Sequence, residues 1–109
     1  MTDPRILVVD DEEIARQNLL HVLGREGYVV DCAATAEEAL GALETTEYQL
    51  VLTDLRMPGM DGLSLLRRIK ERQQATEVIV ITAHASTESA VEAMRAGAFF
   101  YIEKPFRLA

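Results

Sequence analysis

The stretch Ile6-Leu7-Val8-Val9-Asp10-Asp11-Glu12 joins four apolar residues directly to three carboxylates. A run that is apolar at every position suits a strand buried on both faces, as parallel strands covered by helices are. Four further runs of this kind follow, over residues 28–33, 50–53, 78–82 and 99–102. The sequence therefore predicts a parallel sheet in which several strands end at polar residues.

Helical patterns separate these runs. In each of the first two intervals, four apolar residues share one helix face: Ala15, Leu19, Val22 and Leu23, then Ala36, Ala39, Leu40 and Leu43. Thr35 and Glu38 predict a capping box before the second helix. A third helix is expected after a cap at Asp61, and a fourth over residues 86–96 with Met94 in the core. The alternation of strands and helices predicts a doubly wound α/β fold with five parallel strands.

The composition limits the classes of function. The chain has 109 residues, of which 49% are hydrophobic and 27% charged, as expected for one ordinary globular domain. A formal net charge of −7 disfavours binding to nucleic acid or an anionic membrane, so the expected partner is a protein. We expect a cytoplasmic protein, because the sequence shows neither a membrane-spanning run nor a signal-peptide pattern. The single cysteine, Cys32, is expected to be a buried strand residue.

Chemically active side chains follow the ends of three of the apolar runs. Asp10 and Asp11 follow the first run, Asp54 the third and Lys104 the fifth. Because parallel strands end along one edge of a sheet, we expect these residues to converge. An isolated Asp-Asp pair more often only caps a helix, and a single Lys104 is more often a solvated loop residue. Several such coincidences together favour a functional site.

Three carboxylates in one pocket would repel one another unless a cation neutralised them. Mg²⁺ is the expected ion, because it binds one or two carboxylates, keeps several waters and takes phosphate oxygens. The sequence contains no calcium loop of the Asp-x-Asp-x-Asp-Gly kind, and the spacing of His21 and His84 does not suit zinc or iron. Thr82 ends the fourth run with a hydroxyl group, and the small Ala83 beside it leaves room for an incoming group.

Four segments, in order and with compatible spacing, resemble the receiver domain of bacterial two-component response regulators. They are Val-Val-Asp-Asp-Glu at 8–12, Leu-Thr-Asp-Leu-Arg-Met-Pro-Gly-Met-Asp-Gly at 52–62, Ile-Thr-Ala at 81–83 and Tyr-Ile-Glu-Lys-Pro-Phe at 101–106. The resemblance covers essentially the whole chain. It implies a flavodoxin-like receiver fold and a phosphorelay function.

The resemblance also implies a role for each site residue. Asp54 would be the phosphoacceptor and Lys104 would contact the phosphoryl group, while Thr82 and Tyr101 would be the switch residues. The implied Mg²⁺ ligands are the carboxylates of Asp10, Asp11 and Asp54 and the backbone carbonyl of Arg56. Glu12 would have only a supporting role, and His84 and Ala83 would lie at the rim of the pocket.

The implied partners are a sensor histidine kinase, which donates the phosphoryl group, and an output domain or effector protein. The domain would be a regulatory phosphoacceptor rather than an enzyme, assisting only its own phosphorylation and dephosphorylation. Segment 54–62 is similar to that of enhancer-binding transcriptional activators, although a single-domain chemotaxis-type regulator would share every site residue.

Two alternatives stay open. One is a Mg²⁺-dependent phosphatase with an aspartyl-phosphate intermediate, but such enzymes have Asp-x-Asp after the first strand, where this chain has Asp10-Asp11. The other is a receiver fold kept only for dimerisation, which would not need Asp54, Lys104 and Thr82 together.

The end of the chain departs from the family pattern. Residues 105–109 resemble the beginning of a fifth helix, which receivers usually complete. Losing it would remove three or four buried apolar side chains at about 1.5–3 kcal/mol each, against a net stability on the order of 5–15 kcal/mol. We therefore interpret residues 1–109 as one receiver domain without its C-terminal helix. Truncation is the favoured explanation, with a homodimer through the bare face as an expected consequence.

Overall fold

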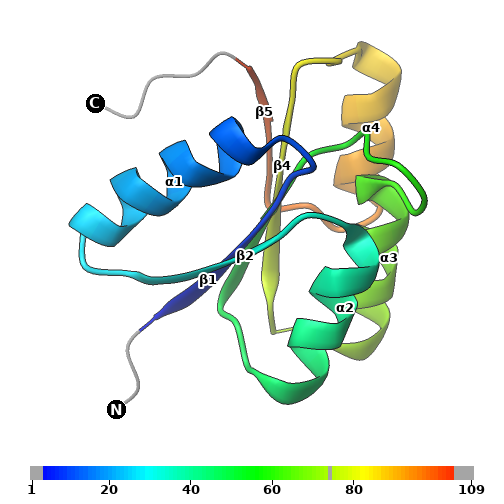
Figure 1. The fold of residues 1–109 in the computed structure, drawn as a ribbon. Helices are drawn as coiled ribbons and strands as arrows, with labels where there is room; N and C mark the ends of the chain where they lie inside the picture. The colour runs from blue at the N-terminus through cyan, green and yellow to red at the C-terminus, as the bar shows by residue number, and fades with distance from the viewer. Residues whose placement is uncertain (1–3, 74, 105–109) are drawn as a thin grey trace.

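The computed structural model describes residues 4–73 and 75–104. Along the chain its elements are β1 (Arg5–Val9), α1 (Glu13–Arg25), β2 (Val29–Ala33), α2 (Ala36–Thr45), β3 (Leu50–Thr53), α3 (Gly62–Arg72), β4 (Glu77–Thr82), α4 (Thr87–Arg95) and β5 (Phe100–Glu103). Within the described residues the strands form one parallel sheet in the order β2-β1-β3-β4-β5. Figure 1 shows α1 on one face of this sheet and α2, α3 and α4 on the other. The predicted doubly wound fold is confirmed, whereas the predicted start of a fifth helix lies outside the described residues.

The central strands are buried on both faces, which explains their unbroken apolar runs. In β1, Leu7 and Val9 belong to the core that α2, α3 and α4 share with the sheet. Ile6 and Val8 point to the opposite face and belong to a smaller cluster with Leu19 of α1. None of the described helices has both the length and the hydrophobicity needed to cross a membrane.

The helix caps agree only partly with the sequence pattern. The side chain of Thr35 accepts the N–H of Glu38 at 3.1 Å, as predicted. The predicted capping box is incomplete, because Glu38 reaches one residue further back and accepts the N–H of Ala34 at 3.3 Å. A complete capping box lies at the start of α4 instead, between Ser86 and Ser89.

Two residues that we expected in the core are exposed. Cys32 lies on β2, a strand at the edge of the sheet, where neighbouring elements cover its side chain incompletely. Met94 is 48% exposed, because α4 packs against the sheet through the small Ala93 and turns Met94 outward. Phe99, just before β5, and Phe100, its first residue, are also more than half exposed.

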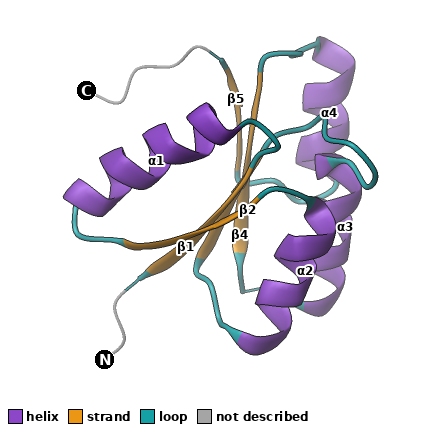
Figure 2. Cartoon of the chain, viewed as in Figure 1, coloured by secondary structure: helices purple, strands orange, loops and turns teal. Residues whose placement is uncertain are grey.

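The strand register determines which loops meet at the carboxyl edge of the sheet. Val9 of β1 pairs with Thr53 of β3, so the next residue of each strand, Asp10 and Asp54, leaves the sheet beside the other. On β5, Glu103 pairs with Thr82 of β4, and Lys104 follows it. Figure 2 shows loops continuing from these strands, which bring residues distant in sequence to one edge.

Candidate functional site

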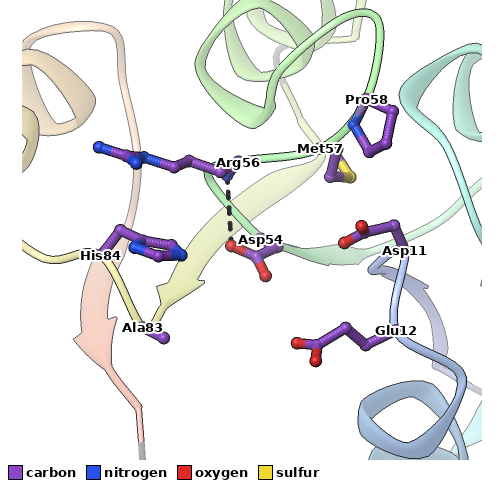
Figure 3. Close-up of a pocket in the computed structure, with 8 residues that line it drawn as sticks. All are labelled: Asp11, Glu12, Asp54, Arg56, Met57, Pro58, Ala83 and His84. Carbon is purple, nitrogen blue, oxygen red and sulfur yellow. Dashed lines mark hydrogen bonds between the residues drawn. The ribbon is translucent and has the colours of Figure 1, made fainter.

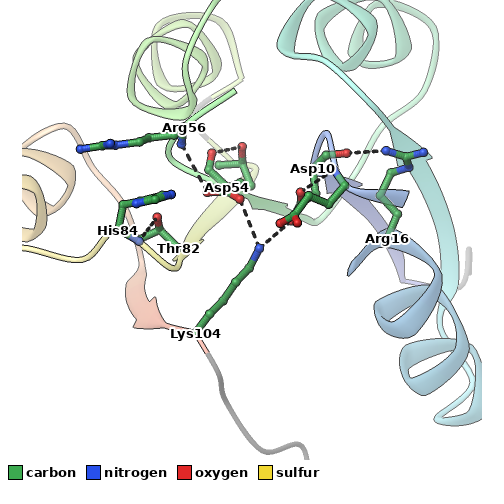
Figure 4. A network of polar contacts seen from close by, with 9 residues as sticks. Asp10, Arg16, Asp54, Arg56, Thr82, His84 and Lys104 are labelled. Carbon is green, nitrogen blue, oxygen red and sulfur yellow. Dashed lines mark hydrogen bonds and ion pairs between the residues drawn. The ribbon is translucent and has the colours of Figure 1, made fainter. Parts of the chain in front are cut away.

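A lysine contacts two buried aspartates at the carboxyl edge of the sheet (Figure 4). Lys104 Nζ donates to Asp10 Oδ2 at 2.8 Å and to Asp54 Oδ2 at 3.2 Å. Asp10 is 3% exposed and Asp54 is 7% exposed, and buried carboxylates are costly without a compensating charge. The ammonium group of Lys104 therefore stabilises both carboxylates. The predicted convergence of these three strand ends is confirmed.

Lys104 keeps its charge at this position. Burial disfavours the ammonium form, but hydrogen bonds and charge interactions with Asp10, and then with Asp54, outweigh burial and hold the pKa of Lys104 above its ordinary value of 10.5. Lys104 is therefore a permanent positive charge beside the two carboxylates at neutral pH.

The backbone and side chain of Asp10 are both fixed. Asp10 Oδ1 accepts the N–H of Glu12 at 2.9 Å, and the carbonyl oxygen of Asp10 accepts from Arg16 Nη1 at 2.7 Å. Figure 4 shows the guanidinium group of Arg16 reaching this carbonyl from α1. The sequence analysis missed Arg16, since an arginine in the second turn of a helix gives no signal that separates it from a solvated residue.

The loop after β3 positions Asp54 through close backbone contacts. Thr53 Oγ1 donates to the carbonyl oxygen of Asp54 at 2.9 Å, and Asp54 Oδ1 accepts the N–H of Arg56 at 3.3 Å. At the end of this loop, Gly62 donates its N–H to the carbonyl of Leu55 at 2.8 Å. A Cβ atom at Gly62 would lie only 2.0 Å from the carbonyl oxygen of Asp54. The sequence analysis cited Gly62 only as part of a motif and missed this steric requirement.

Three carboxylates are close enough to share one ion. Asp10, Glu12 and Asp54 can each place an oxygen within 4.8 Å of the others. Among the described residues this group differs from the predicted ligands, because it includes Glu12 rather than Asp11. Hard oxygen donors beside an open pocket fit the preference of Mg²⁺ for a few carboxylates and several waters.

An open pocket of about 460 Å³ lies over Asp54 (Figure 3). Its lining consists of Asp11, Glu12, Asp54, Arg56, Met57, Pro58, Ala83 and His84. Asp11 and Glu12 approach Asp54 from the loop after β1, while Ala83 and His84 border the opposite side. Ala83 and His84, which we predicted at the rim of the pocket, therefore line the same pocket as Asp54.

Thr82 and Tyr101 lie on the same face of the sheet. Thr82 is fully buried, and its Oγ1 accepts the N–H of His84 at 3.0 Å, which leaves the hydroxyl proton out of this bond. Tyr101 pairs with Val80, two residues before Thr82, so the tyrosine ring is diagonally adjacent to Thr82. The phenol oxygen of Tyr101 lies 2.5 Å from Ser89 Oγ on α4.

Comparison with known proteins gives consistent results. The family model "Response regulator receiver domain" matches residues 6–109. Regulatory protein AtoC of Escherichia coli (strain K12) is 42% identical over 104 residues, which are 95% of this chain and 23% of AtoC. The chain thus spans about a quarter of the length of that relative.

Two solved structures show the same similarity in three dimensions. A CheY-like response regulator receiver domain protein from Methanospirillum hungatei JF-1 has a TM-score of 0.94 and 37% identity, covering 97% of this chain and 85% of its own. The response regulator TrrA from Thermotoga maritima, solved in complex with Mg(2+)-BeF, has a TM-score of 0.87 and 38% identity over 95% of this chain and 89% of its own.

Proposed function

This chain belongs to the response regulator receiver domain family, and from that premise we propose that it accepts a phosphoryl group on Asp54 and responds by changing its α4–β5 surface. The observation that best supports this proposal is the environment of Asp54. One carboxylate oxygen contacts Lys104, and the side chain also lines an open pocket beside other carboxylates. Phosphorelay signalling follows from the family, whereas the residue roles are our proposal.

In the proposed reaction, an oxygen of Asp54 attacks the phosphorus of a phosphohistidine on a sensor histidine kinase. The new O–P bond forms as the N–P bond breaks, and the departing imidazole takes a proton from solvent. Lys104, 3.2 Å from Asp54, would neutralise charge on the phosphoryl oxygens. Phosphoryl transfer depends mainly on positioning and electrostatic stabilisation, so the protein does not need a complex catalytic apparatus. The domain is thus a regulatory phosphoacceptor, not an enzyme with its own substrate.

Asp10, Asp11, Asp54 and the backbone carbonyl of Arg56 would hold Mg²⁺, with Glu12 in support. When bound, Mg²⁺ supplies positive charge that offsets the repulsion between the carboxylates and the incoming phosphoryl group. The spacing of the Asp10, Glu12 and Asp54 carboxylates supports a cation at this place, and Asp11 is included because it lines the same pocket as Asp54. The Mg(2+)-BeF complex of the related TrrA also supports it.

Asp11 is expected to contribute more to Mg²⁺ affinity than Glu12. Both line the pocket, but the shorter side chain of Asp11 loses less rotamer entropy when it is fixed. We expect Asp11→Asn to weaken Mg²⁺ binding about tenfold, on the order of 1.4 kcal/mol, and Glu12→Gln about threefold or less. A Mg²⁺ titration followed by amide chemical shifts measures both effects. Glu47→Gln is the control, because Glu47 precedes β3 and lies at the amino ends of the strands, away from the site. If Glu12→Gln weakened Mg²⁺ binding more than Asp11→Asn does, the two roles would be reversed.

Phosphorylation would be transmitted through Thr82 and Tyr101. An acyl phosphate adds roughly −1.5 to −2 charges and new acceptor oxygens. The hydroxyl proton of Thr82 could then be donated to the phosphoryl group, and the space that Thr82 leaves would admit the ring of Tyr101. This movement would change the surface formed by α4 and β5.

Loss of the carboxylate at position 54 tests the proposal. We expect wild-type protein with Mg²⁺ and beryllofluoride to show amide shift changes around Asp54, Thr82 and Tyr101, and Asp54→Asn to show none. With acetyl phosphate as donor, only wild type should gain the mass of one phosphoryl group. Glu47→Gln should behave as wild type. Equal labelling of a folded Asp54→Asn protein would exclude Asp54 as the acceptor.

We propose that the protein acts in the cytoplasm, where its partners are a sensor histidine kinase and an output domain or effector protein, and a homodimer is compatible with the proposal. Similarity to the DNA-binding transcriptional regulator NtrC of Escherichia coli (strain K12), 42% identical over 101 residues, supports an output in transcription regulation. The resemblance of segment 54–62 to enhancer-binding activators points to the same kind of output. The family match over residues 6–109 gives the phosphatase alternative and the purely structural alternative no support.

A further inference from the structure

The resting orientation of Tyr101 is fixed by hydrogen bonds to the first turn of α4. The phenol oxygen lies 2.5 Å from Ser89 Oγ, and the N–H of Ser86 donates to the same phenol oxygen at 3.4 Å. The ring itself packs against the core beneath α4. These contacts attach the side chain of Tyr101 to the helix that lies beside it.

The same serine hydroxyl also completes the capping box of α4. Ser89 Oγ accepts the N–H of Ser86 at 3.2 Å, and the hydroxyl groups of the two serines lie 3.0 Å apart. Ser86 Oγ in turn accepts the N–H of Ser89 at 3.0 Å. The hydrogen bonds that begin α4 and those that hold Tyr101 therefore form one network centred on Ser89.

We propose that Ser89 is a positioning residue that holds Tyr101 in its resting orientation and thereby sets how strongly the phosphoryl signal must act to turn the ring inward. This inference rests on the proposed function, because it concerns the same switch. If Tyr101 turns toward Thr82, its phenol group leaves Ser89 and Ser86. Removing the Ser89 hydroxyl lowers that cost and raises the fraction of molecules with Tyr101 inward.

A larger inward fraction makes a phosphoryl mimic bind more tightly, because apparent affinity scales with the population of the binding-competent state. Loss of one neutral hydrogen bond that exists only in the resting state changes this population about fivefold. We therefore expect Ser89→Ala to bind beryllofluoride with Mg²⁺ about fivefold more tightly than wild type. Tyr101→Phe lacks the other half of the same bond and should show a similar gain.

The test is a double-mutant cycle with Ser89→Ala, Tyr101→Phe and the double variant, each titrated with beryllofluoride at fixed Mg²⁺. If Ser89 acts through the phenol group, Ser89→Ala has no further effect in the Tyr101→Phe background. If Ser89→Ala raises beryllofluoride affinity as much in the Tyr101→Phe background as in wild type, Ser89 acts only as a helix cap and the proposal is wrong. Wild-type affinity in Ser89→Ala would also overturn it.

A second readout separates this inference from the proposed function. This readout is the ¹³C chemical shifts of the Tyr101 ring in Ser89→Ala, measured without beryllofluoride. We expect these shifts to move toward the values of wild type with bound beryllofluoride. If wild type does not bind beryllofluoride, we expect them to differ from the values of free wild type. Tyr48, whose hydroxyl donates to Asp31 at 2.6 Å, provides an internal reference that should not move. If wild type fails to bind the mimic while the Tyr101 ring still responds to Ser89→Ala, the proposed function fails and the positioning role stands. An unmoved ring in Ser89→Ala overturns the positioning role.

Discussion

Gly62→Ala is expected to lower the free energy of unfolding by about 3 kcal/mol or more, the upper end of what overpacking a folded protein costs. The added Cβ would lie 2.0 Å from the carbonyl oxygen of Asp54, 2.9 Å from its carbonyl carbon and 3.0 Å from Leu55 Cα. All three are backbone atoms, so no side-chain rotation relieves the overlap. The end of β3 or the start of α3 must move, and Asp54 moves with it.

Urea unfolding followed by circular dichroism measures this loss, with Gly41→Ala as the matched control. Gly41 lies inside α2, and nothing lies within 4 Å of a Cβ built there. Because alanine is a better helix former than glycine, Gly41→Ala should stabilise the protein by roughly 0.5–1 kcal/mol. A Gly62→Ala protein within about 0.5 kcal/mol of wild type would show that the loop accommodates a methyl group. In folded Gly62→Ala molecules we expect a weaker response to beryllofluoride.

The requirement at Gly62 shows where sequence reasoning reaches its limit. The apolar runs were enough to predict the sheet, and the apolar stripes and cap residues between them were enough to predict the four helices. The meeting of Asp10, Asp54 and Lys104 could also be predicted, because the carboxyl ends of parallel strands lie along one edge of the sheet. The sequence Asp61-Gly62 indicated a helix start, and Asp61 does accept the N–H of Ser64 at 2.8 Å. The approach of Gly62 to Asp54 depends on the path of the loop between them, which local pattern does not determine.

The errors have related causes. Cys32 belongs to an apolar run, and Met94 lies at helical spacing from Ala90 and Val91. Whether a neighbour covers them depends on strand order for Cys32 and on which face of α4 packs inward for Met94. A helix can approach a sheet most closely through small residues, and here Ala93 does so while Met94 does not. The contacts of Arg16 and Ser89 join segments whose relative placement only the folded chain defines.

Lys104→Met is expected to change metal binding and signalling in opposite directions. In the wild type, Lys104 neutralises Asp10 and Asp54, which are also the carboxylates proposed to hold Mg²⁺. An ammonium group and a divalent ion in one pocket repel each other by on the order of 1–2 kcal/mol even in a high dielectric. Removing the ammonium should therefore raise Mg²⁺ affinity about tenfold. The response of Thr82 and Tyr101 to beryllofluoride should be lost, because the bound group then lacks the ammonium group that contacts Asp54 in the wild type.

The same substitution makes folding depend on the metal. Without Mg²⁺, Lys104→Met leaves two buried carboxylates uncompensated, which should cost about 3 kcal/mol of stability. Since Mg²⁺ binds the folded state, saturating Mg²⁺ should recover much of this loss. Urea unfolding with and without Mg²⁺ measures the recovery. Lys70→Met is the matched control, because Lys70 donates to Thr76 and Glu77 away from the site and its loss should leave Mg²⁺ affinity unchanged. If Lys104→Met bound Mg²⁺ no more tightly than wild type, Lys104 and the metal would not share these carboxylates, and the proposed site would have to lie nearer Asp11 and Glu12.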